Sequence, residues 1–140
     1  MQLQPGMLMP SVSKYMTPKP FTIDRLATIA EAHRFMPAPA IRPLPVVAKG
    51  ELCGIVSDRD LVAFENAGAD PNMSLVHSAM TEHPFIVTSD TALDEVVEIM
   101  GEQKYGSVVV MGSDGIEGIF TASDACAAFA KVLRSASAIA

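Results

Sequence analysis

Two short segments of the sequence place a hydroxyl side chain three residues before an aspartate. Ser57 precedes Asp60 in one segment, and Thr121 precedes Asp124 in the other. Each segment follows an apolar stretch, so we expect a strand to end at the hydroxyl residue and a helix to begin after it. At a helix start the two residues can form a capping box, in which each side chain accepts a hydrogen bond from the backbone N–H of the other residue.

The same residues are also suited to binding a ligand. A helix N-terminus presents unpaired backbone N–H groups, and a carboxylate there can accept hydrogen bonds from the two vicinal hydroxyls of a ribose. A glycine in the preceding strand, Gly54 or Gly118, would let a flat base approach the backbone closely. The spacing alone does not separate capping from ligand binding, so both interpretations stay open at this point.

The chain repeats itself with the offset that carries Asp60 onto Asp124. Without any gap, the same offset aligns Met16-Thr17 with Met80-Thr81, Pro20-Phe21 with Pro84-Phe85, Met36 with Met100, and Gly54-Ile55 with Gly118-Ile119. A fixed period of this kind indicates a duplicated supersecondary unit, here 12–67 and 76–131. We therefore expect an N-terminal extension (1–10), motif 1 (11–68), a linker (69–74), motif 2 (75–134) and a frayed tail (135–140).

Each repeat predicts the element order β-α-β-β-α, which gives an α/β (α+β) fold class. A helical turn capped by Ser11 or Ser74 should open each repeat, and the prolines after it force extended backbone. Capping-box spacing at Thr28 and Thr91 predicts the next helix in each copy. Strands are expected at 21–23, 44–47 and 52–56 and at 85–87, 107–111 and 116–120, and the last helices at 58–66, closed by Gly68, and at 122–133.

The composition argues against several classes of protein. The 140 residues carry 10 basic and 16 acidic side chains, and the net charge of −6 argues against a protein that binds nucleic acid backbones. Two cysteines and three dispersed histidines lack the spacing of a metal site. No nucleophile elbow, phosphate-binding P-loop or dinucleotide fingerprint is found, so we expect neither catalysis nor a required cofactor. No apolar stretch is long enough to cross a membrane, and no signal peptide opens the chain, so we expect a cytoplasmic protein.

The two repeats together resemble a known family. The motifs of the CBS domain, named after cystathionine β-synthase, are similar to Met16-Thr17-Pro18, Ile41-Arg42-Pro43-Leu44-Pro45-Val46-Val47 and Gly54-Ile55-Val56-Ser57-Asp58-Arg59-Asp60. Two such motifs in tandem resemble a CBS pair, or Bateman module. The segment 104–110 is similar to stand-alone bacterial CBS pairs of the acetoin-utilisation type. The resemblance implies two pseudo-symmetric motifs packed through their sheets.

The resemblance also implies regulation rather than catalysis. CBS pairs commonly bind adenosine-containing ligands, such as AMP, ADP, ATP or S-adenosylmethionine, in clefts between the two motifs. For this chain it implies ribose contacts from Asp60 and Asp124 with Ser57 and Thr121, phosphate contacts from Arg42 and Arg59, contacts to the base from the segments of Thr17 and Thr81, and apolar contacts from Val46, Ile55 and Ile119.

The two copies differ at the residues expected to meet phosphate. Gly106 and Ser123 replace Arg42 and Arg59 in the second repeat, so we expect one strong phosphate site and one that is weaker or empty. The module should form a homodimer and pass its ligand state to an effector protein that the sequence does not identify. A ligand-free dimerisation or scaffold module is the alternative, favoured by the acidic balance and the Ala-rich last helix.

Overall fold

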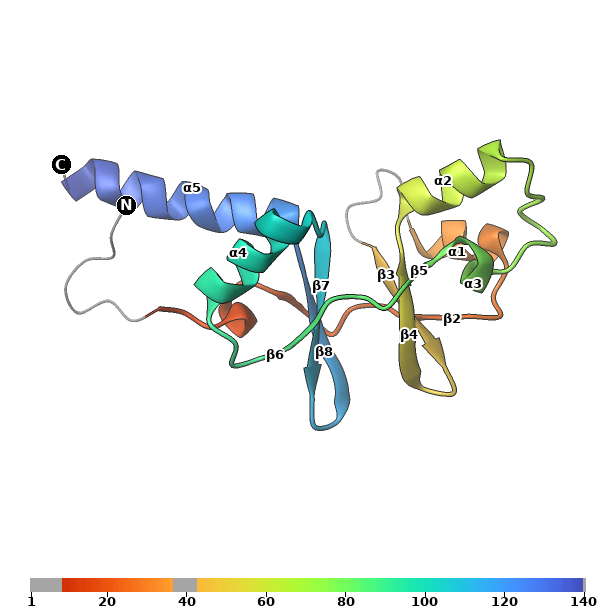
Figure 1. Ribbon diagram of the computed structural model, residues 1–140, viewed down its shortest axis with the longest axis horizontal. Helices are drawn as coiled ribbons and strands as arrows, with labels where there is room; N and C mark the ends of the chain where they lie inside the picture. Colours follow the sequence, from red (N-terminus) through yellow and green to blue (C-terminus); the bar gives the residue numbers. More distant parts are fainter. Residues whose placement is uncertain (1–8, 37–42, 140) are drawn as a thin grey trace. The chain divides into compact units, whose positions relative to one another are not determined.

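The structure contains the same order of elements twice. The computed structural model describes residues 9–36 and 43–139 (Figure 1). The first repeat forms the 3-10 helix η1 (Val12–Lys14), β1 (Thr17–Pro18), β2 (Ile23–Asp24), α1 (Ile29–Phe35), β3 (Leu44–Ala48), β4 (Glu51–Val56) and α2 (Asp58–Asn66). The second repeat forms α3 (Val76–Ala79), β5 (Thr81–Glu82), β6 (Ile86–Thr88), α4 (Leu93–Gln103), β7 (Ser107–Gly112), β8 (Gly115–Thr121) and α5 (Ala122–Ile139). The predicted α/β class and the β-α-β-β-α order are confirmed, with a helical turn and a two-residue strand before each copy.

Each of the two four-stranded sheets takes one edge strand from the other repeat. The strand orders are β2-β3-β4-β5 and β1-β8-β7-β6. Strand β5 pairs antiparallel with β4, and β1 pairs antiparallel with β8. The chain therefore divides into a contiguous unit, residues 20–84, and a split unit, which joins the segment ending at Lys19 to the segment beginning at Phe85. We call η1 with β1, and α3 with β5, the leading segments of the two repeats.

In the contiguous unit, α1 connects the parallel strands β2 and β3. Strands β3 and β4 form a hairpin whose loop residues Lys49 and Gly50 have φ values of 52° and 81°, as a type I′ turn requires. The core consists of Ile23, Ile29, Ala32, Met36, Leu44, Val46, Val56, Leu61 and Val76. Val76 is fully buried although it comes from the leading segment of the second repeat.

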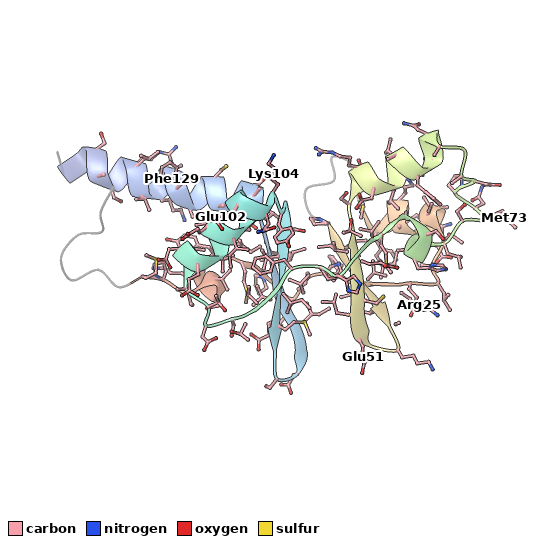
Figure 2. The ribbon with its side chains drawn as sticks, in the orientation of Figure 1. Arg25, Glu51, Met73, Glu102, Lys104 and Phe129 are labelled. Atoms are coloured by element: carbon pink, nitrogen blue, oxygen red, sulfur yellow. The ribbon has the colours of Figure 1, made fainter. Side chains whose placement is uncertain are left out.

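The split unit reproduces this arrangement. Strands β6 and β7 are parallel, and the β7–β8 hairpin has a bulge after Val110, equivalent to the bulge after Val46. Helix α4 ends at Gln103, and Lys104, which is labelled in Figure 2, follows as the C-cap residue. Lys104 has a φ of 60°. The core consists of Val12, Val96, Met100, Val108, Val110 and Phe120. Val12 is fully buried and comes from the leading segment of the first repeat, so each core is completed by a valine from the other copy.

Two of the predicted helix caps are wrong because tertiary contacts occupy those residues. Helix α3 begins after Leu75, since the Ser74 carbonyl accepts a hydrogen bond of 3.0 Å from the first N–H of α1. Helix α4 begins after Ala92, since the Thr91 carbonyl accepts a hydrogen bond of 2.9 Å from the first N–H of η1. Neither Leu75 nor Ala92 makes a side-chain cap.

Of the other predicted helix ends, those at Thr28 and Gly68 are confirmed, whereas Ser11 occupies the N-cap position without a side-chain cap. Thr28 caps α1, and its Oγ1 accepts a hydrogen bond of 3.1 Å from the N–H of Glu31. Ser11 precedes η1, but its Oγ bonds to the Ser13 hydroxyl at 2.7 Å instead of capping the turn. Gly68, with a φ of 108°, follows α2 as the C-terminal glycine of a Schellman motif.

The last helix is longer than the sequence predicts. Helix α5 continues through Ile139, so residues 135–139 extend it and do not form the expected frayed tail. The segment from Ala122 to Ile139 holds neither glycine nor proline, and it is rich in alanine, the residue with the highest helix propensity. The expected stop at Leu133 therefore has no local cause.

Two glycines allow the exchanged edge strands to approach the sheets. A Cβ on Gly54 would lie 2.5 Å from Met80 Sδ and 2.9 Å from the Thr81 carbonyl oxygen. A Cβ on Gly118 would collide with the Met16 side chain and lie 3.0 Å from the Thr17 carbonyl oxygen. The sequence suggested that these glycines admit a flat base, but the structure fills their space with the leading segments.

Gly54→Ala is expected to lower the free energy of unfolding by roughly 2 kcal/mol, because the added methyl group displaces β5 from β4. Urea unfolding measures this change. Gly101→Ala is the matched control, since nothing lies within 4 Å of its Cβ position in α4. That substitution should raise the free energy of unfolding by roughly 0.5–1 kcal/mol. Equal changes in the two variants would contradict the close approach.

Candidate functional site

The start of α2 holds one of the two predicted Ser/Thr-Asp pairs. The N–H of Asp60 donates to Ser57 Oγ at 3.1 Å, and the N–H of Ser57 donates to Asp60 Oδ2 at 2.9 Å. The capping box is therefore formed. Both residues are half-buried, and within the described residues Asp60 Oδ1 accepts no hydrogen bond. The cap thus orients a carboxylate and leaves one of its oxygens without a protein donor in this part of the chain.

The start of α5 repeats the arrangement. The N–H of Asp124 donates to Thr121 Oγ1 at 3.2 Å, and the N–H of Thr121 donates to Asp124 Oδ2 at 2.9 Å. The Thr121 hydroxyl also donates to Asp124 Oδ2 at 3.1 Å. Thr121 is only 5% exposed and is the last residue of β8, directly before α5. The capping interpretation is therefore seen at both helix starts.

The exchange of edge strands brings together candidate residues from different repeats. Thr81 on β5 is the register partner of Ile55, two residues before Ser57. Thr17 on β1 is the register partner of Ile119, two residues before Thr121. Each unit therefore holds one Met-Thr strand beside the strand that leads into one capping box. The sequence spacing gave no signal of this pairing, which depends on hydrogen bonds between distant strands.

The apolar candidate residues of the strands are buried. Val46 and Ile119 have no exposed surface, and Ile55 is 8% exposed. Thr17 is half-buried, and Thr81 is exposed. Thr81 is therefore accessible to a ligand, whereas the three apolar side chains are not.

Of the two candidate phosphate contacts, the structure describes Arg59 but not Arg42. Arg59 is exposed in the first turn of α2 and makes no ion pair with the described residues. Arg42 lies outside the described residues. Arg59 and Asp60 are neighbours at the helix start, so one cation and one oriented carboxylate occur together in the first repeat.

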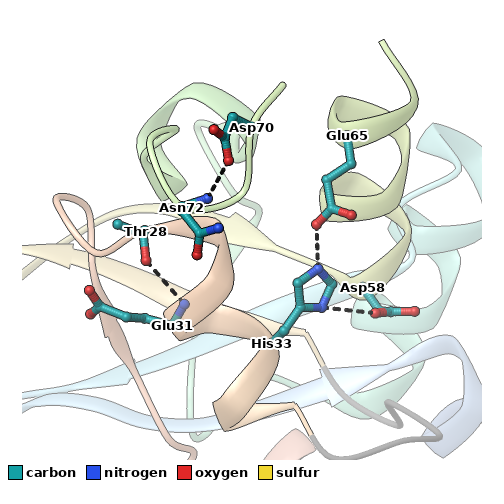
Figure 3. Close-up of polar contacts among 7 residues, drawn as sticks. All are labelled: Thr28, Glu31, His33, Asp58, Glu65, Asp70 and Asn72. Carbon is teal, nitrogen blue, oxygen red and sulfur yellow. Dashed lines mark hydrogen bonds and ion pairs between the residues drawn. The ribbon is translucent and has the colours of Figure 1, made fainter. Parts of the chain in front are cut away.

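A histidine ties α1 to α2 in the first repeat only. His33 Nε2 lies 2.5 Å from Glu65 Oε1, and His33 Nδ1 lies 4.0 Å from Asp58 Oδ1 (Figure 3). The equivalent positions in the second repeat hold Val97, Phe129 and Ala122. His33 therefore contacts both ends of α2, and the aligned residues Val97, Phe129 and Ala122 cannot form the same contacts.

Other chemistry finds little support in the described part of the chain. Burial raises the pKa of the Cys53 thiol, with the nearby Arg25 acting in the opposite direction, so this thiol is a poor nucleophile at neutral pH. No group of three or more His, Cys, Asp or Glu side chains is placed to hold a metal ion among residues 9–36 and 43–139. Over the same residues, no helix has the length and apolar character needed to span a membrane.

Comparison with solved structures agrees with the doubled architecture. An acetoin utilization protein (AcuB) from Vibrio cholerae superposes with a TM-score of 0.78 at 31% identity, over 91% of this chain and 95% of that chain. The CBS domain pair of protein MJ0100, solved with 5′-methylthioadenosine and S-adenosyl-L-methionine, gives a TM-score of 0.77 at 25% identity, over 89% of this chain and 98% of that chain.

Comparison with known sequences points to the same family. YlbB, an uncharacterized protein of Bacillus subtilis (strain 168), is 37% identical over 101 residues, which cover 71% of this chain and 68% of that protein. Inosine-5′-monophosphate dehydrogenase of Korarchaeum cryptofilum (strain OPF8) is 32% identical over 104 residues, but these are only 21% of that enzyme. The family model of the CBS domain matches residues 12–66 and 76–131. The chain therefore belongs to the CBS domain family and carries the domain twice.

Proposed function

We propose that this chain is a regulatory module that binds an adenosine-containing ligand and passes its ligand state to a partner protein. The observation that carries the proposal is the oriented carboxylate of Asp60 at the start of α2. The relative MJ0100 supports the ligand class, since it was solved with two adenosine-containing molecules. AMP, ADP, ATP and S-adenosylmethionine are the candidates. No cofactor is required for this role.

The ribose contact follows from the capping geometry. Asp60 Oδ2 is held by the Ser57 N–H, so the carboxylate has a defined direction before any ligand arrives. Its Oδ1 can accept a hydrogen bond from a ribose hydroxyl, and a charged acceptor makes that bond stronger than a neutral one. Asp124 supplies the equivalent carboxylate in the second repeat. The cap and the ligand contact are therefore compatible uses of one side chain.

The residues proposed to contact phosphate belong to the first repeat. Arg59 is an exposed cation beside Asp60, while Ser123 takes its place beside Asp124. Arg42 is proposed as a second phosphate contact from the sequence resemblance. We infer that ligands with phosphate groups bind more strongly at the α2 start than at the α5 start.

A ligand-free scaffold is the second candidate function. Four large apolar side chains of α4 and α5 are exposed: Val97 (36%), Ile99 (38%), Phe129 (56%) and Leu133 (44%). Figure 2 labels Phe129 on α5. Such side chains suit a homodimer, which we propose under both functions. The mass in solution therefore does not separate the two, whereas ligand titration does. Failure of all four candidate ligands to bind nucleotide-free protein would favour the scaffold.

Asp60→Asn is expected to weaken binding of AMP roughly tenfold or more, because the variant loses a charged acceptor for the ribose hydroxyl. Isothermal titration of nucleotide-free protein measures the affinity. The amide oxygen can still accept from the Ser57 N–H, so urea unfolding should change little. Asp114→Ala, in the exposed turn between β7 and β8, is the control and should bind like wild type. Unchanged affinity in Asp60→Asn would remove the ribose role of this residue.

Arg59→Gln is expected to weaken ADP binding roughly tenfold and to leave adenosine binding within about twofold, because only ADP carries the charge that the guanidinium neutralises. The same titration compares the two ligands. Arg134→Gln, an exposed arginine on α5, is the matched control. Equal losses for ADP and adenosine would show that Arg59 acts on the fold instead of on the phosphates.

A further inference from the structure

The chain passes between its two units at only two places. It leaves the split unit after Lys19 and enters the contiguous unit at Pro20. It returns between Pro84 and Phe85. The two passages are equivalent under the sequence repeat, since Lys19-Pro20 aligns with His83-Pro84. We call these two dipeptides the crossovers.

Both crossovers hold a residue with unfavourable backbone geometry. Lys19 has a φ of 48° and His83 a φ of 55°, which is left-handed backbone that a side chain with a Cβ rarely adopts. The proline that follows favours extended backbone at the residue before it, so a competing extended state exists at both positions. Both side chains are exposed, so packing of the side chain does not explain the conformation.

Strand β1 holds the first crossover on the side of the split unit. The Lys19 N–H donates to the Glu117 carbonyl at 3.0 Å and so prolongs the β1–β8 pairing by one residue. Pro20 has no N–H with which to continue that pairing. The regular hydrogen bonding along β1 therefore ends at the residue where the chain changes units.

We propose that Lys19-Pro20 and His83-Pro84 form a pair of strained hinges between the two units. Each hinge has two backbone states, the left-handed state seen in the structure and the extended state favoured before proline. Because the chain joins the units through both passages, and each passage places a left-handed residue before a proline, a reorientation of the units requires both hinges to change. The hinges are therefore a conformational device of the fold.

The hinges would also connect ligand binding to the output of the module, and this part rests on the proposed function. Thr17 and Thr81, two candidate ligand residues, each lie two residues before a left-handed residue. A ligand that bonds to the backbone of these strands has a different affinity for the two hinge states, which is the condition for shifting their populations. The partner protein would then sense the hinge state.

Distances between spin labels, measured by double electron–electron resonance, test the hinges. One label occupies Cys126, which is exposed on α5, and the other occupies Asn66→Cys at the end of α2, in a Cys53→Ser background. Dilution with unlabelled chain suppresses signals between copies. Lys19→Gly with His83→Gly should broaden the distance distribution roughly twofold, because glycine populates both signs of φ about equally.

The matched control uses the two other left-handed lysines. Lys49 and Lys104, with φ values of 52° and 60°, lie inside single units. Lys49→Gly with Lys104→Gly relieves the same kind of strain but should leave the distribution as in wild type. A wild-type distribution in the crossover variant, or equal broadening in the control, would overturn the proposal.

Measurements with added AMP or S-adenosylmethionine test the hinge and the proposed function separately. In wild type the ligand should shift the distribution, and in the crossover variant the shift should be smaller. If the glycine pair broadens the distribution but no ligand changes it, the hinge stands and the ligand-driven function fails. If calorimetry shows that the ligands bind but the crossover variant keeps the wild-type distribution, the ligand-binding function stands and the hinge fails.

Discussion

The close approach of two strands from different repeats is the constraint on which the structure depends. Gly54 and Gly118 leave room for the Met-Thr strand of the other copy, and a side chain at either position would push that strand away. The same leading segments deliver Val76 and Val12 to the two cores, where both are fully buried. Neither sheet is four-stranded, and neither core is complete, without a segment from the other repeat.

This exchange decides which candidate residues become neighbours. Thr81 belongs to the second repeat, yet it lies in the unit that holds Ser57 and Asp60. Thr17 lies in the unit of Thr121 and Asp124 in the same way. The capping boxes themselves are local and hold the carboxylates at the helix starts by backbone hydrogen bonds. At the ligand site that we propose, a bound molecule would contact strands of both repeats.

The two copies share a backbone but differ in charge. The first repeat has Arg59 at the helix start and the contact between His33 and Glu65, whereas the second has Ser123, Val97 and Phe129 in their places. The backbone register is the same in both, including the bulge in each hairpin. The two copies therefore keep the same strand pairing while their exposed side chains differ in charge at the helix starts.

The sequence by itself determined the duplication, the α/β class, the hairpins and both capping boxes, because each depends on residues close together in the chain. Helix α2 has the predicted bounds for that reason. Only the tertiary structure decided that β1 and β5 change sheets, that Ser74 and Thr91 do not cap helices, and that the space beside Gly54 is filled by Met80. Those outcomes depend on hydrogen bonds and packing between segments far apart in the sequence. A local sequence pattern does not specify which distant strand pairs with a given edge.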